Sequence, residues 1–125
     1  ILNSLLAIKE EFLHDLDSMF KKVGTENLFL FSVNTLSLCI IKSQKTLSLN
    51  IMGIIDNDPS IQGHQVSQIG IYNLSDPNLN TKNMSVFIAN QNSESVESIK
   101  VQLANRGINA SRITNLFLHP SKLPI

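Results

Sequence analysis

The chain has 125 residues, of which 42% are hydrophobic and only 16% are charged, and its net charge at pH 7 is zero. This length predicts a single domain with a core of its own. The neutral balance excludes the basic surface that nucleic-acid binding requires, and no apolar run approaches the roughly 20 residues that cross a bilayer. The single cysteine, Cys39, cannot form an internal disulfide, which fits a reducing compartment or an extracytoplasmic domain without cross-links.

Residues 1–23 carry the pattern of one long amphipathic helix that ends at Gly24. Its wide apolar stripe consists of Leu2, Leu5, Leu6, Phe12, Leu13, Leu16, Met19, Phe20 and Val23. A stripe of this width favours packing across a sheet over a coiled coil or a partner-binding helix. Because the chain starts at Ile1 instead of Met, we expect a fragment of a longer protein, in which a membrane anchor can precede Ile1.

Three apolar runs of strand length follow between residues 27 and 55: LFLFSV, LSLCIIK and TLSLNIMGII. Every second residue of the last two runs is apolar, as a strand with one buried face requires. The polar residues 43–45 between these runs have the length of a hairpin loop, so we expect two antiparallel strands there. The phase of the alternation changes after Val33, which predicts a bulge or turn near Asn34.

Two strong turn signals divide the middle of the chain. Residues 56–59 read Asp-Asn-Asp-Pro and residues 76–78 read Asp-Pro-Asn, and both runs are typical of turns. Between them, Val66–Leu74 has the character of a strand and carries no charged residue. We therefore expect one strand here, lying at an exposed edge of the sheet because its flanks are polar loops.

The stretch from residue 84 to residue 120 reads strand, helix, strand. Apolar residues at i, i+3 and i+7, namely Val96, Ile99 and Leu103, predict a helix over residues 93–106. Asn92 or Ser93 can cap its start, and Gly107 can close its end as a Schellman motif.

The flanking runs, residues 86–89 and 116–118, are expected to be strands, and Pro120 stops the second. Strands joined by a helix of this length run parallel. Taken together, the patterns predict an α+β fold in a single domain, residues 1–125. A mixed, mainly antiparallel sheet of five to six strands would carry the long N-terminal helix and the helix near the C-terminus.

The sequence offers little catalytic or metal-binding chemistry. His14, His64 and His119 have no ligand residue at a metal-binding spacing, and the Asp56 turn lacks the glycine and the glutamate of a calcium loop. Cys39 lies in an apolar run, where a buried and unreactive thiol is expected. No nucleophile motif and no phosphate-binding glycine loop occurs. We therefore expect a protein that is not an enzyme and that holds no cofactor and no metal.

One resemblance offers a binding function. The segment SESVESIKVQLANRGINASRI resembles the last helix and turn of the C-terminal domain of outer-membrane protein A and its relatives, and IMGIIDN resembles their strand and following turn. That family folds as an α/β sandwich and binds the diaminopimelate of peptidoglycan through a turn aspartate and a helix arginine. The resemblance implies that Asp56 matches the aspartate, whereas Ser95 and Val96 stand where the arginine would be.

The function expected from these observations is a protein–protein interaction or assembly domain of a bacterial envelope protein in the periplasm. Its partner would be another protein or a second copy of itself. The surfaces expected to make the contact are the edge at residues 66–74 and the N-terminal helix, through Val66, Ser67, Ile69, Ile71, Leu5, Phe12 and Met19. Two alternatives are a sensor or regulatory partner domain that encloses an apolar small molecule, and a peptidoglycan-binding domain.

Overall fold

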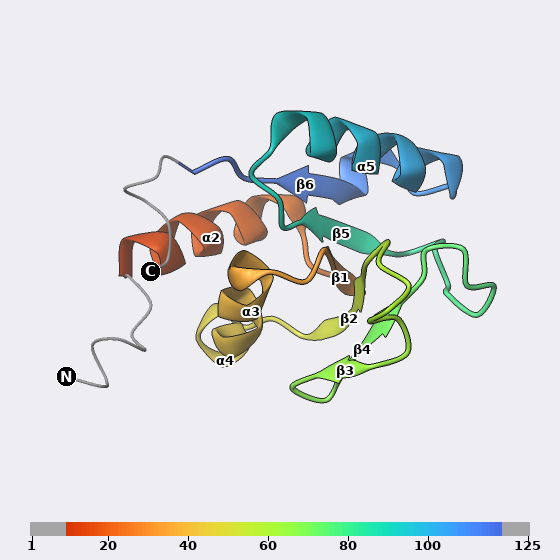
Figure 1. The fold of residues 1–125 in the computed structure, drawn as a ribbon. Coiled ribbons are helices and arrows are strands. Elements are labelled where there is room, and N and C mark those ends of the chain that lie inside the picture. The colour runs from red at the N-terminus through yellow and green to blue at the C-terminus, as the bar shows by residue number, and fades with distance from the viewer. Residues whose placement is uncertain (1–9, 119–125) are drawn as a thin grey trace.

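The computed structural model describes residues 10–118, which form one layered α+β fold (Figure 1). The expected helix residues 1–9, including Leu5, and the expected stop at Pro120 lie outside the described residues. In chain order, the elements are α2 (Glu10–Val23), β1 (Leu28–Phe31), α3 (Thr35–Lys42), α4 (Gln44–Leu47), β2 (Ile51–Ile55), β3 (Gln65–Val66), β4 (Ile69–Tyr72), β5 (Ser85–Ile88), α5 (Ser93–Asn105), a 3₁₀ turn (Ala110–Arg112) and β6 (Ile113–Asn115).

The six strands form one mixed sheet in the order β3-β4-β2-β1-β5-β6. Only β3 and β4 pair antiparallel, and the four other pairs are parallel. The expected α+β class with a mixed sheet is confirmed, but the expectation of a mainly antiparallel sheet is wrong. The physical reason is that helices connect β1 to β2 and β5 to β6, and such crossovers return the chain in the same direction.

Helices cover both faces of the sheet. On one face, α2, α3 and α4 pack against the strands, and the rings of Phe20 and Phe87 lie 5.5 Å apart. On the other face, α5 packs through its buried apolar residues. Neighbouring strand residues point to opposite faces. In three pairs of neighbours, the first residue faces α2, α3 and α4 and the second faces α5: Leu30 and Phe31, Ile54 and Ile55, and Phe87 and Ile88.

Residues 35–42 are a helix, so the expected hairpin around residues 43–45 is wrong. The turn expected near Asn34 exists, but it is the start of α3. The Oδ1 atom of Asn34 accepts a hydrogen bond from the backbone N–H of Ser37 at 3.0 Å, and the Ser37 hydroxyl oxygen accepts one from the N–H of Asn34 at 2.9 Å. This reciprocal cap starts a helix, although the apolar residues of the run would fit a strand as well as a helix. Cys39 consequently lies in a helix and not in a strand.

The segment expected as one strand over Val66–Leu74 is a hairpin instead. Ser67 and Gln68 have positive φ angles of 49° and 69°, which is the two-residue turn that matches the twist of β3 and β4. β4 therefore lies between β3 and β2 and not at an exposed edge. The N–H of Ile71 donates to the carbonyl of His64 at 2.9 Å, so the side of β4 that faces away from β2 is already paired.

The strand-helix-strand unit near the C-terminus agrees well with the sequence. The strand before the helix and the helix itself lie where they were expected, as β5 and α5. The second strand, β6, occupies residues 113–115, directly before the expected residues 116–118. β5 and β6 pair parallel, as expected.

Candidate ligand-binding cleft

A polar cleft lies at the carboxyl ends of the central strands. The chain passes from β1 to β2 on one side, whereas β5 lies on the other side of β1, so the strand order reverses between β1 and β5. Sheets of this kind bind ligands in the crevice at such a switch point. Here the cleft has a volume of about 560 Å³. Its lining residues are Phe31, Ser32, Asp56, Asn57, Asn90, Asn92, Glu94, Ser95, Ser98, Ile99 and Gln102.

The carboxylate of Asp56 holds the ends of β1 and β2 together. Its Oδ2 atom accepts a hydrogen bond from the N–H of Val33 at 2.8 Å, and its Oδ1 atom accepts one from the N–H of Asp58 at 2.9 Å. Between these strand ends, Ser32 has a φ of 88°, which is uncommon for a residue with a side chain. Strain of this kind concentrates where a chain is shaped for binding. Asp56 therefore fixes the floor of the cleft.

Asn34 connects the start of α3 to the end of β5. Its side-chain amide donates a hydrogen bond to the carbonyl of Ala89 at the end of β5, while its oxygen caps the helix through Ser37. The turn from β1 into α3 contains no glycine, so the backbone has no open loop that could surround a phosphate.

The first turns of α5 form the opposite wall. Asn90 accepts a hydrogen bond from the N–H of Asn92 at 2.8 Å, and Asn92 in turn caps α5 through the N–H of Ser95 at 2.9 Å. The lining contains two carboxylates, on Asp56 and Glu94, and no lysine, arginine or histidine. Its remaining polar groups are amides and hydroxyls. The wall is therefore suited to hydrogen-bond donors such as hydroxyl and amine groups, and it repels phosphates.

Other titratable groups lie away from this cleft. Burial raises the pKa of the Cys39 thiol, an effect that Lys42 partly opposes. The hydroxyl and the N–H of Ser60 donate to Asp58 and lower the pKa of its carboxyl in an exposed turn. Within residues 10–118, no three His, Cys, Asp or Glu side chains come together as a metal site.

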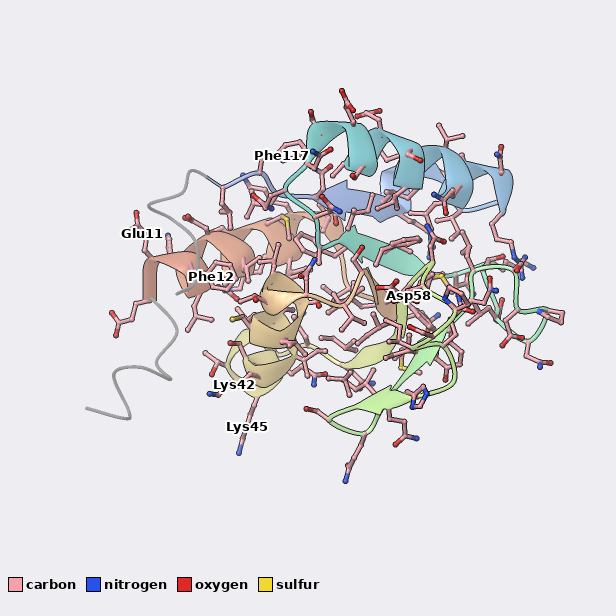
Figure 2. The ribbon with its side chains drawn as sticks, in the orientation of Figure 1. Glu11, Phe12, Lys42, Lys45, Asp58 and Phe117 are labelled. Carbon is pink, nitrogen blue, oxygen red and sulfur yellow. The ribbon has the colours of Figure 1, made fainter. Side chains whose placement is uncertain are left out.

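The structure separates the residues that the sequence indicated for partner contact. Phe12, Ile69 and Ile71 are buried in the core, and Val66 and Met19 are half-buried. Of the described members of this set, only Ser67 is exposed, at the tip of the β3–β4 turn. Figure 2 shows Phe12 on α2 and the exposed Phe117 on the segment after β6.

The cleft residues were mostly missed from the sequence. The sequence indicated Asp56 as a turn residue and as the match to the aspartate of the outer-membrane protein A family, Asn92 as a helix cap, and Ser95 only as a residue at the place of that family's arginine. The signal that could have found them is that polar residues directly follow the apolar strands at Asp56 and Asn90. These positions converge only if the strands are parallel, whereas the sequence indicated antiparallel pairing.

Asp56 and Ser95 line the same cleft, whereas Val96, the other residue at the place of the arginine in the outer-membrane protein A family, is buried in the core. Comparison with protein-family models, with curated proteins and with solved structures finds no match to the chain. None of the helices within the described part of the chain is both long and apolar enough to cross a membrane.

Proposed function

We propose that this domain binds a small polar molecule, rich in hydroxyl or amine groups, in the cleft between β1, β2 and α5, and that it does so without catalysing a reaction. The observation that carries the proposal is the position of the cleft. It lies where the strand order reverses, and side chains from the ends of three strands and from one helix converge on it.

The charge of the lining supports this ligand class over nucleotides. Asp56 and Glu94 can both accept hydrogen bonds from an ammonium or a hydroxyl group, and no cation in the lining balances a phosphate. Phe31 and Ile99 supply a limited apolar surface against which a sugar ring or an aliphatic chain can pack.

The sequence suggested, as an alternative, a sensor domain that encloses an apolar small molecule. The present proposal differs from that alternative because the lining of the cleft is mainly polar. The peptidoglycan alternative belongs to the same ligand class through its sugar hydroxyls and its amine. The assembly role, the periplasmic location and the membrane anchor stay predictions.

The test is a titration of ¹⁵N-labelled protein with a neutral saccharide, a muropeptide, a polyamine and a nucleotide, followed by amide chemical shifts. We expect saturable shifts at Asn90, Ser95 and Ser98 with at least one of the first three ligands, and none with the nucleotide.

A matched pair of variants places the binding site. Ser98→Trp fills the cleft and should abolish the shifts, whereas Ala104→Trp adds the same ring at an exposed position of α5 outside the cleft and should leave them unchanged. Equal binding by both variants, or binding of the nucleotide alone, would overturn the proposal.

A further inference from the structure

Two aromatic rings line a second pocket, on the face of the sheet that carries α5. This pocket has a volume of about 260 Å³, and its described lining includes no residue of α5 or of the cleft. The lining residues are Asn27, Phe29, Met52, Tyr72, Asp76, Asn78, Leu79 and Asn80. They lie in or next to β1, β2 and β4, and in the segment that connects β4 to β5 (Figure 1).

Gly53 allows the rings of Phe29 and Tyr72 to meet over β2. A Cβ atom at Gly53 would lie 2.7 Å from the Cε2 atom of each ring, so a side chain there would displace them. The ring centroids are 6.1 Å apart and the ring planes are inclined at 63°. Both rings are half-buried and both line the pocket. The pocket therefore has two aromatic walls, and one ligand group can lie within about 6 Å of both centroids.

The charge of this pocket is negative. Among the described residues of its lining, only Asp76 has a charged side chain. Its Oδ1 atom accepts a hydrogen bond from the N–H of Asn78 at 2.9 Å, and its backbone carbonyl accepts one from the guanidinium of Arg106 at 3.0 Å. These bonds hold the turn that carries the carboxylate, and Arg106 itself does not line the pocket. A carboxylate and the negative faces of two aromatic rings together attract a cation.

We propose that this pocket binds a small organic cation with a methylated ammonium group, of the size of choline. Aromatic walls are the usual means by which proteins recognise such groups. The thioether side chain of Met52, which is 48% exposed, adds a polarizable surface for the methyl groups. The volume lies below the range of about 300–1,000 Å³ that is typical of pockets for drug-sized ligands, so the ligand is small. The inference does not rest on the cleft, because the two linings share no residue.

Tyrosine fluorescence measures binding at this pocket directly, because Tyr72 is the only tyrosine and the chain contains no tryptophan. The probe is choline chloride, titrated at constant ionic strength, and we expect a saturable change of the fluorescence with a Kd in the millimolar range. The control ligand is dimethylbutanol, in which a carbon atom replaces the nitrogen of choline. It has nearly the same shape without the charge, and it should bind at least about tenfold more weakly.

The same ammonium group occurs in lipid headgroups, where a phosphate accompanies it. Phosphocholine should bind more weakly than choline, because Asp76 repels the phosphate. Tighter binding of phosphocholine would indicate a headgroup site and would overturn the assignment to a free cation.

Two matched pairs of variants test the carboxylate and the rings. Asp76→Asn removes the charge and should weaken choline binding about threefold. Asp58→Asn removes the same charge from a similar turn, in which Asp58 accepts a hydrogen bond from the N–H of Ser60 at 2.9 Å, and it should leave binding unchanged. Phe29→Leu removes one aromatic wall and should weaken binding about tenfold. Phe117→Leu, at an exposed ring outside the pocket, should have no effect.

Amide chemical shifts of the ¹⁵N-labelled chain locate the bound cation. With choline we expect shifts at Gly53 and Asn78 and none at Ser98, which lines the cleft. Shifts confined to Ser98 would overturn this inference and leave the proposed function standing. The inference would also be overturned by the absence of a saturable response to choline, by equal binding of dimethylbutanol, or by equal effects of Asp58→Asn and Asp76→Asn.

Discussion

Asn34 joins the start of α3 to the end of β5. Its oxygen caps α3, its amide donates to the carbonyl of Ala89 after β5, and its backbone N–H donates to the hydroxyl of Ser37, which is fully buried. Every buried polar side chain of the described residues has a partner. Because Asn34 satisfies groups on both sides of the switch point, it fixes the carboxyl ends of β1 and β5 relative to each other.

The behaviour of Cys39 follows from its burial in α3, where it is 6% exposed. We expect thiol reagents to label the native chain slowly and the unfolded chain rapidly, and Cys39→Ser to cost about 1–3 kcal/mol of stability without changing ligand binding. Thr46→Cys, at an exposed position, is the control that should label quickly in both states. Rapid labelling of native Cys39 would contradict its burial.

The raised pKa of the Cys39 thiol also predicts a pH dependence with a definite sign. The folded chain favours the protonated thiol. Below the ordinary pKa of 9.0 the thiol is protonated in both states, so it adds no pH dependence to the free energy of unfolding. Above 9.0 the unfolded chain ionises first, and stability should fall as the pH rises through the higher value of the folded state. Denaturant melts of the original chain and of Cys39→Ser between pH 8 and pH 11 measure the difference, and identical pH profiles would remove this contribution.

At the scale of elements, α5 ends in a complete Schellman motif. The N–H of Ile108 donates to the carbonyl of Leu103 at 3.1 Å, and the N–H of Gly107 donates to that of Ala104 at 3.0 Å. Gly107 has a φ of 91°, and Ile108 folds back into the core beside Leu103. The cap thereby turns the chain from α5 toward β6.

Gly107→Ala is expected to destabilise the fold by about 1 kcal/mol, because a Cβ atom at this positive φ is strained. No atom lies within 4 Å of the position of that Cβ, so the cost is conformational and not steric. Asn105→Ala, at an exposed helical position, is the control and should change stability by less than about 0.5 kcal/mol. Denaturant melts compare the two variants, and equal effects would show that the left-handed conformation of Gly107 does not stabilise the end of α5.

At the scale of the whole molecule, α2 is a part of the core. Phe12, Leu16 and Phe20 are buried against the face of the sheet that also carries α3 and α4. The sequence favoured packing of this helix on a sheet over binding to a partner. In the structure, the sheet covers the apolar face of α2. A partner could therefore contact only the outer residues of the helix, and Met19 is half-buried.

Phe12→Ala is therefore expected to lower the free energy of unfolding by about 3–5 kcal/mol, since it leaves a cavity where the ring was fully buried. Lys22→Ala, on the exposed side of α2, should have almost no effect. Thermal and denaturant melts measure both variants. An unchanged free energy of unfolding for Phe12→Ala would show that α2 does not stabilise the core. That result would favour the alternative that α2 binds a partner.

Local signals in the sequence determined the unit from β5 to β6. Asn92, the spacing of Val96, Ile99 and Leu103, and Gly107 all act within a few residues of the chain, so they indicate the same helix whatever surrounds it. The α+β class followed from this unit, from α2 and from the apolar runs. The sequence also established that the chain has a neutral, weakly charged surface.

Only the tertiary structure decided between helix and strand for residues 35–42. This run is apolar nearly throughout, with Leu38 exposed and its neighbours buried, so its pattern fits both structures. The Asn34 side chain that caps the helix also donates to the carbonyl of Ala89, far away in the sequence, so the start of α3 is tied to the end of β5. Strand direction and order likewise depend on pairing between distant segments. For that reason the convergence of Asp56, Asn90 and Ser95 on one cleft could not be read from the sequence.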